Sequence, residues 1–130
     1  MKTPRWPLAL GALLTALAIG LAALASHALP EIMLDPTRSQ RFTTGLQMHA
    51  INAPGLVLFG IALMLRPANP LWLGAAALLL LGIVFFSGNL YLLAFLQNSP
   101  ALWLTPVGGL CLMSSWLIFA VGAFYRPRVG

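Results

Sequence analysis

The stretch Phe86-Ser87-Gly88-Asn89-Leu90-Tyr91 interrupts an apolar run that begins at Leu71 and continues to Leu96. It places three polar side chains where hydrocarbon otherwise continues. Inside a lipid bilayer, such groups need hydrogen-bond partners that the protein itself supplies. The expected partners lie on neighbouring segments, and together with the stretch and with His27 they form one candidate polar cluster: His27, Gln47, His49, Asn52, Ser87, Asn89, Tyr91 and Thr105.

The composition is that of an integral membrane protein. Of the 130 residues, 60% are hydrophobic and 7% are charged, a balance outside the range of soluble domains. Seven basic residues against Glu31 and Asp35 give a net charge of +5, and most of the basic residues lie at the ends of apolar segments. This placement is typical of topology signals and argues against nucleic-acid binding. The lipid bilayer is therefore the main expected partner.

Four apolar segments predict an all-α membrane protein. We expect a single domain over residues 1–130, with transmembrane helices at about 6–28, 42–65, 71–96 and 101–125. The short polar connections predict an antiparallel bundle. Residues 30–40 hold both acidic side chains and are expected to form a polar loop outside the bilayer.

The first apolar segment has two interpretations, a retained helix or a secretory signal with a cleavage-like site at Ala23-Leu24-Ala25. We favour the retained helix, because the segment has the roughly 20 residues that a membrane span requires. Small residues at Ala12, Ala16 and Gly20 also predict a face for close helix packing. On the last segment, Gly108, Cys111, Ser115 and Gly122 predict a second such face.

Four spans place both chain ends on one side of the membrane. That side carries more of the basic residues than the other, with Lys2, Arg5, Arg66, Arg126 and Arg128 against Arg38 and Arg41. The positive-inside bias therefore predicts cytoplasmic termini. In this orientation His49 and Asn89 each lie about 10 Å below the outer end of their helix, at ~1.5 Å per residue. The polar cluster is thus expected in the outer half of the bilayer.

The sequence offers no recognisable catalytic, cofactor or metal motif. His49 and Asn52 share a helical face, which is typical of an interhelical hydrogen-bonded contact as much as of a ligand site. His27 is expected to be a solvated interfacial histidine, and Ser87 lacks a histidine and an acid at triad-like spacing. Cys111 is expected to be a buried, inert thiol.

Several motifs resemble those of the YgdD-like family of small inner-membrane proteins, a domain of unknown function with relatives in animal mitochondria. The 86–91 stretch is followed at similar spacing by Thr105-Pro106-Val107-Gly108-Gly109, while Ser26-His27-Ala28-Leu29 and Phe42-Thr43-Thr44-Gly45 resemble two further family elements. The resemblance implies four helices and a multi-pass protein of the bacterial inner membrane. In one departure, Asn52 falls where the family has a histidine, and His49 lies nearly one turn earlier.

The sequence is compatible with three functional hypotheses. The first is a non-enzymatic structural, accessory or assembly component that needs no cofactor and has a membrane-protein partner or forms a homo-oligomer. The second is a small-molecule or ion permease acting as an oligomer, which the apolar inner half disfavours. The third is a membrane-embedded enzyme using His27 or His49 as a base, which the scarcity of ionisable groups disfavours.

Overall fold

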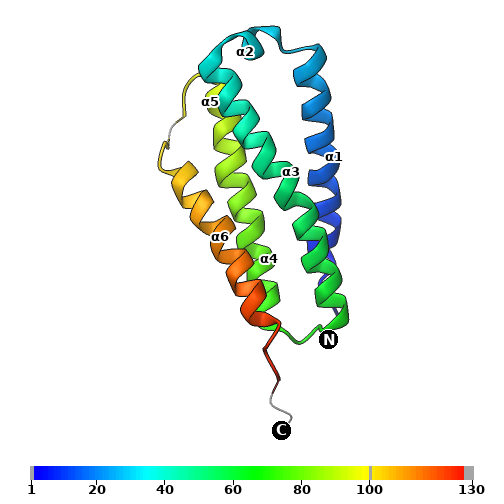
Figure 1. Ribbon diagram of the computed structural model, residues 1–130. Helices are drawn as coiled ribbons and strands as arrows, with labels where there is room; N and C mark the ends of the chain where they lie inside the picture. Colours follow the sequence, from blue (N-terminus) through cyan, green and yellow to red (C-terminus); the bar gives the residue numbers. More distant parts are fainter. Residues whose placement is uncertain (1, 100, 128–130) are drawn as a thin grey trace.

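A computed structural model describes residues 2–99 and 101–127 of the chain as a set of helices (Figure 1). Arg128, which entered the charge prediction, lies outside these residues. Within them, four helical spans are long and apolar enough to cross a membrane, Trp6–His27, Pro36–Leu65, Pro70–Leu96 and Leu104–Gly122. No strand occurs in the described ranges. The all-helical class of membrane protein predicted from the sequence is confirmed.

The segment expected to be a polar loop at residues 30–40 is mostly helical. It contains the short helix α2 (Pro30–Leu34) and the start of α3 (Pro36–Leu65), so the second span begins earlier than the predicted residue 42. The reason is a capping signal that the apolar pattern does not reveal. The Asp35 carboxylate accepts hydrogen bonds from the backbone N–H groups of Thr37 and Arg38 at 3.0 and 3.1 Å, and Pro36 follows directly. An aspartate cap followed by proline is a strong helix start.

The third span, expected at about 71–96, consists of three consecutive helical pieces. They are α4 (Pro70–Gly82), the π-helix η1 (Ile83–Gly88) and α5 (Asn89–Leu96). Asn69 caps α4, since its side chain accepts hydrogen bonds from the backbone N–H groups of Leu71 and Trp72. After Leu96, Gln97 adopts a left-handed conformation with φ of 55°, which ends the helix. The polar stretch of residues 86–91 begins inside the π-helix η1, which ends at Gly88.

The first and last spans are shorter than predicted. Helix α1 (Trp6–His27) begins with a proline in its first turn. Helix α6 (Leu104–Gly122) begins three residues after the expected residue 101, which places Pro106 in its first turn, where a proline removes no hydrogen bond within the helix. At its far end, the backbone N–H of Tyr125 bonds to the Gly122 carbonyl, so the chain tightens into turns.

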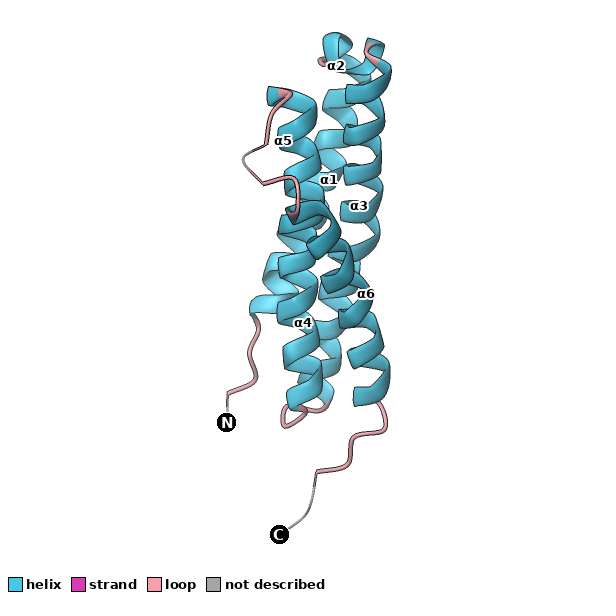
Figure 2. Cartoon of the chain, turned by 90° about the vertical axis from the view of Figure 1, so that its left-hand side faces the viewer, coloured by secondary structure: helices cyan, strands magenta, loops and turns pink. Residues whose placement is uncertain are grey.

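The spans alternate between the two ends of the bundle. Both chain ends and the α3–α4 connection lie at the lower end in Figure 1, whereas α2 lies at the upper end. Figure 2, turned by 90°, shows the same arrangement. Helix α3 packs against α1 on one side and against α4, η1 and α5 on the other, and α6 packs mainly against α4 and η1. Helix α3 is therefore the element that joins α1 to the rest of the bundle.

Glycines allow the closest helix contacts. A Cβ atom added to Gly11 would lie 2.6 Å from the backbone nitrogen of Val57, and one added to Gly82 would lie 2.9 Å from the backbone nitrogen of Leu112. The packing face predicted on α1 is wrong, because Ala12, Ala16 and Gly20 are exposed and Gly11 and Ala18 are buried instead. Neighbouring positions on a helix point about 100° apart, so a shift of one or two residues selects another face.

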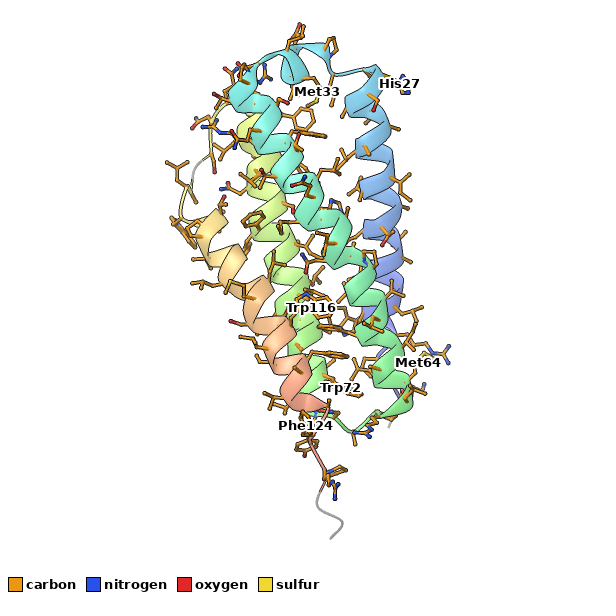
Figure 3. The ribbon with its side chains drawn as sticks, in the orientation of Figure 1. His27, Met33, Met64, Trp72, Trp116 and Phe124 are labelled. Atoms are coloured by element: carbon orange, nitrogen blue, oxygen red, sulfur yellow. The ribbon has the colours of Figure 1, made fainter. Side chains whose placement is uncertain are left out.

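An aromatic stack fills the lower half of the bundle. It comprises Phe59 of α3, Trp72 of α4, and Trp116 and Phe119 of α6, and Figure 3 labels its two tryptophans. The rings of Phe59 and Phe119 are parallel with centroids 4.0 Å apart, and Trp72 stacks on Phe119 at 5.1 Å. Trp116 meets Phe59 edge-on at 4.9 Å. The stack packs α3, α4 and α6 together below the polar residues.

Candidate functional site

Ser87 joins the π-helix to α3. Its hydroxyl donates a buried 2.7 Å hydrogen bond to the Gly45 carbonyl. The approach at this glycine of α3 is close, since a Cβ at position 45 would lie 3.2 Å from both Leu90 Cβ and Tyr91 Cε1 and would have to push these side chains back by a few tenths of an ångström. An extra residue in a π-helical turn changes the direction in which its side chains point. Ser87 is only 1% exposed, so this polar group lies wholly between helices.

His49 and Tyr91 make a second contact between the same two spans. His49 Nδ1 lies 2.9 Å from the Tyr91 hydroxyl oxygen. The imidazole is 2% exposed, and its other nitrogen, Nε2, has no hydrogen-bond partner among the described residues. Whichever nitrogen carries the proton, one buried polar atom of this ring stays unpaired.

Asn52 links α3 to α6 just above the aromatic stack. Its amide nitrogen donates to the Met48 carbonyl of its own helix at 2.8 Å, and its amide oxygen accepts from Trp116 Nε1 at 2.8 Å. Both ends of the amide are thus occupied within the bundle. Asn52 therefore serves as a bridge between α3 and α6.

Asn89 faces the start of α6 instead of α3. Its amide nitrogen donates to the Thr105 hydroxyl at 2.8 Å, and its amide oxygen accepts from the Ser99 hydroxyl. Asn89 is 2% exposed. This side chain therefore ties both the α5–α6 connection and the start of α6 to the start of α5.

Gln47 and His27 lie apart from these contacts. Gln47 is exposed and lines a groove of about 380 Å³ between α1 and α3, together with Thr15 and Thr43. His27 is the exposed last residue of α1, and Figure 3 shows it at the top of that helix. Of the eight candidate residues, four therefore form two separate pairs, His49 with Tyr91 and Asn89 with Thr105. Ser87 and Asn52 bond instead to Gly45 and Trp116, which the sequence analysis did not include in the cluster.

The described residues show no arrangement typical of a reaction centre. Ser87 donates to a backbone carbonyl, not to a histidine. No group of three or more His, Cys, Asp or Glu side chains in the described part of the chain could hold a metal ion. What these polar groups do in this geometry is join α3 to α5 and α6.

Sequence reasoning missed two polar residues that bind helix ends. Arg38 of α3 donates from Nε to the Ala94 carbonyl at 2.7 Å and from Nη2 to the Phe95 carbonyl at 3.2 Å. Its guanidinium thereby satisfies the last carbonyls of α5, a favourable place for a positive charge. The buried Asn69 caps α4 and also donates to the Gly122 carbonyl of α6 at 2.7 Å. An Asn-Pro pair before an apolar run is the sequence signal that would have identified Asn69 as a cap.

A protein-family model described as "Protein of unknown function (DUF423)" matches residues 21–109, more than half of the chain. The chain belongs to this family. The matched region includes every residue of the four interhelical contacts described above except Trp116 of α6.

Relatives from several bacteria extend the match over nearly the whole chain. The UPF0382 inner membrane protein YgdD of Escherichia coli is 30% identical over 129 residues, covering 98% of this chain and 96% of the relative. The UPF0382 membrane protein YwdK of Bacillus subtilis is 36% identical over 116 residues, covering 88% and 92%. A UPF0382 membrane protein of Staphylococcus haemolyticus is 34% identical over 115 residues, covering 88% and 92%. No solved structure matches the chain.

These relatives and the four apolar spans identify the chain as a multi-pass protein of the bacterial inner membrane. The resemblance drawn from the sequence motifs is confirmed, because YgdD itself is among the relatives. The family description assigns no activity.

Proposed function

We propose that the protein is a non-enzymatic structural, accessory or assembly component of the inner membrane, whose separate polar contacts in the outer half of the bilayer hold its own helices together. The observation that carries this proposal is the use of the polar atoms. Asn52, Ser87 and Asn89 direct their donors to acceptors on this chain at 2.7–2.8 Å. A substrate site needs polar groups that are free to meet a substrate, and these are occupied.

The same contacts weigh against the other two functions. An enzyme would need a base that has access to a substrate and a partner that orients it. His49 is 2% exposed and bonded to Tyr91, so it lacks access. His27 is exposed but has no side-chain hydrogen bond in the described residues to orient it. A permease would need polar groups at several depths. The lower half of this bundle contains the aromatic stack and the leucine side chains packed with it. Its buried polar side chains Asn69 and Ser115 both donate to backbone carbonyls of this chain and do not face a pathway.

The proposal includes an orientation. We place the lower end of Figure 1, which holds both chain ends and the α3–α4 connection, on the cytoplasmic side. The support is the charge distribution, with Lys2, Arg5, Arg66 and Arg126 at that end and both acidic residues at the other. The spans then run antiparallel, and the hydrogen bonds of His49, Ser87 and Asn89 fall in the outer half.

Affinity purification from cells at native expression level tests the accessory role. The full chain would be extracted in a mild detergent, and bound proteins would be identified after quantitative comparison with an unrelated four-span protein. We expect one membrane protein to be recovered in stoichiometric amount. Recovery of the chain without a stoichiometric partner, combined with ion or solute flux in liposomes containing it, would instead establish the permease.

A further inference from the structure

Two adjoining cavities surround the α3–α4 connection, at the end of the bundle that carries both chain ends (Figure 1). One, of about 370 Å³, lies between this connection and the segment after α6 and is lined by Arg66, Asn69, Tyr125 and Arg126 among others. The second, of about 390 Å³, shares the 67–69 wall and includes Lys2. Three basic side chains, Lys2, Arg66 and Arg126, thus line two hollows that share the wall formed by residues 67–69.

The walls of the first cavity, lined by Arg66 and Arg126, are fixed by hydrogen bonds. Asn69 is 3% exposed and ties the connection to α6 through the Gly122 carbonyl at 2.7 Å. Arg66 donates from Nη1 to the Ala123 carbonyl at 3.3 Å, and its guanidinium carbon lies 5.8 Å from the centre of the Trp72 ring. A cavity that is formed before a ligand arrives loses little conformational freedom on binding.

The arginines of this cavity have no acidic side chain of this chain to pair with. The only carboxylate side chains in the sequence are Glu31 of α2 and Asp35 at the start of α3, and α2 lies at the opposite end of the bundle (Figure 1). Arg66 keeps N–H donors beyond the one directed to Ala123, and Arg126 is exposed. Guanidinium groups bind phosphate oxygens with paired hydrogen bonds, so the chemistry favours a phosphate.

Exposed apolar side chains flank the two arginines. Leu65, directly before Arg66, is 78% exposed, and Phe124, two residues before Arg126, is 87% exposed. A ligand that joins an anionic phosphate to hydrocarbon chains would satisfy both surfaces, whereas a free phosphate ion would use the arginines alone. We propose that this cavity binds the headgroup phosphate of an anionic phospholipid, with the acyl chains lying along Leu65 and Phe124. The proposal does not depend on the accessory role.

Lipid titration of the purified full chain tests this site. Phosphatidylglycerol, phosphatidylcholine and inorganic phosphate would be added separately in detergent, with bound lipid counted by native mass spectrometry and thermal stability recorded. We expect phosphatidylglycerol to bind and stabilise more than phosphatidylcholine. Arg126→Gln should weaken phosphatidylglycerol binding about fivefold, since one basic side chain near a lipid surface is worth about 1 kcal/mol. Arg41→Gln removes the same charge at the other end and serves as the matched control.

Three outcomes would overturn the proposal. Equal losses of binding in Arg126→Gln and Arg41→Gln would show attraction by net charge without a site. Equal binding of the two lipids would show that the arginines do not select an anion. Stabilisation by inorganic phosphate as large as that by phosphatidylglycerol would identify a soluble ligand. Arg66→Lys, which keeps the charge and loses the planar fork, should weaken binding less than Arg126→Gln while the chain remains folded.

Discussion

At the scale of single residues, the bond between His49 and Tyr91 offers a defined test of the interhelical contacts. His49→Leu and Tyr91→Phe should each lower stability by about 0.6 kcal/mol, with an upper value near 1.7, as measured for hydrogen bonds inside membrane proteins. The double variant should cost less than the sum of the two, because either change alone already breaks the 2.9 Å contact. Reversible unfolding in mixed detergent would measure all four proteins. Additive losses would show that the two side chains do not interact.

The pair His49 and Asn89 provides the control for that experiment. Asn89 bonds to Thr105 and Ser99, whereas His49 bonds to Tyr91, so the two side chains share no partner. Losses from His49→Leu and Asn89→Leu should therefore add to within about 0.3–0.5 kcal/mol. Strong coupling between them would restore the single cluster expected from the sequence.

The sequence predicted the polar residues better than it predicted their pairings. Ser87, Asn89 and His49 stand out in apolar runs, and burial of all three follows from the cost of leaving a polar group in lipid. Which partner each one meets depends on the rotation of its helix. The π-helix at Ile83–Gly88 changes that rotation midway along the third span, and nothing in the apolar pattern reveals it.

At the scale of helices, the contact between α6 and η1 depends on Gly108. A Cβ at this position would lie 2.9 Å from the carbonyl carbon of Phe85, so Gly108→Ala must push two backbones apart. We expect a loss of about 1–3 kcal/mol, typical of overpacking. Thermal unfolding in detergent would measure it. Gly74→Ala is the matched control, since a Cβ there has no atom within 4 Å; equal effects of the two changes would contradict the close contact.

The π-helix predicts an unusual tolerance to deletion. A π-helical turn holds one residue more than an α-helical turn, so removing exposed Val84 can convert η1 to α-helix while α4 and α5 keep their faces. Removing exposed Ala77 from α4 would instead rotate one side of the helix by about 100° against the other. We expect the Val84 deletion to yield a monodisperse, folded protein and the Ala77 deletion to aggregate. Equal behaviour of the two in size-exclusion chromatography would contradict this reasoning.

The lengths of the apolar segments predicted the four spans. They did not predict where each helix begins and ends, or which side of it packs against a neighbouring helix. The helical start at Pro36 depends on the Asp35 cap, which lies within a polar segment that resembles a loop. On α6, Gly108, Ser115 and Gly122 of the predicted small-residue face are buried, but Cys111, which was expected to be buried, is only partly so. The face on α1 was not, because alanines and glycines occur around this helix on several sides and spacing alone does not choose among them.

At the scale of the whole molecule, the proposed orientation can be measured with single cysteines. In a Cys111→Ala background, Gln97→Cys and Ala68→Cys place exposed thiols at opposite ends of the bundle. A membrane-impermeant thiol reagent should label position 97 in intact spheroplasts and position 68 only after permeabilisation. The reverse pattern would place the chain ends outside and move the polar contacts to the inner half.

The aromatic stack also gives the protein a spectroscopic signal that reports tertiary packing. Rings held rigidly in asymmetric surroundings give near-ultraviolet circular dichroism, which is lost when tertiary packing loosens even while the helices persist. In a Trp6→Phe chain, α1 holds no tryptophan, and the remaining signal comes largely from Trp72 and Trp116 against Phe59 and Phe119. Such a chain would keep this spectrum if α1 left α3 first and would lose it when α3, α4 and α6 separate. Comparison with helix content would then show the order in which the bundle comes apart without any attached dye.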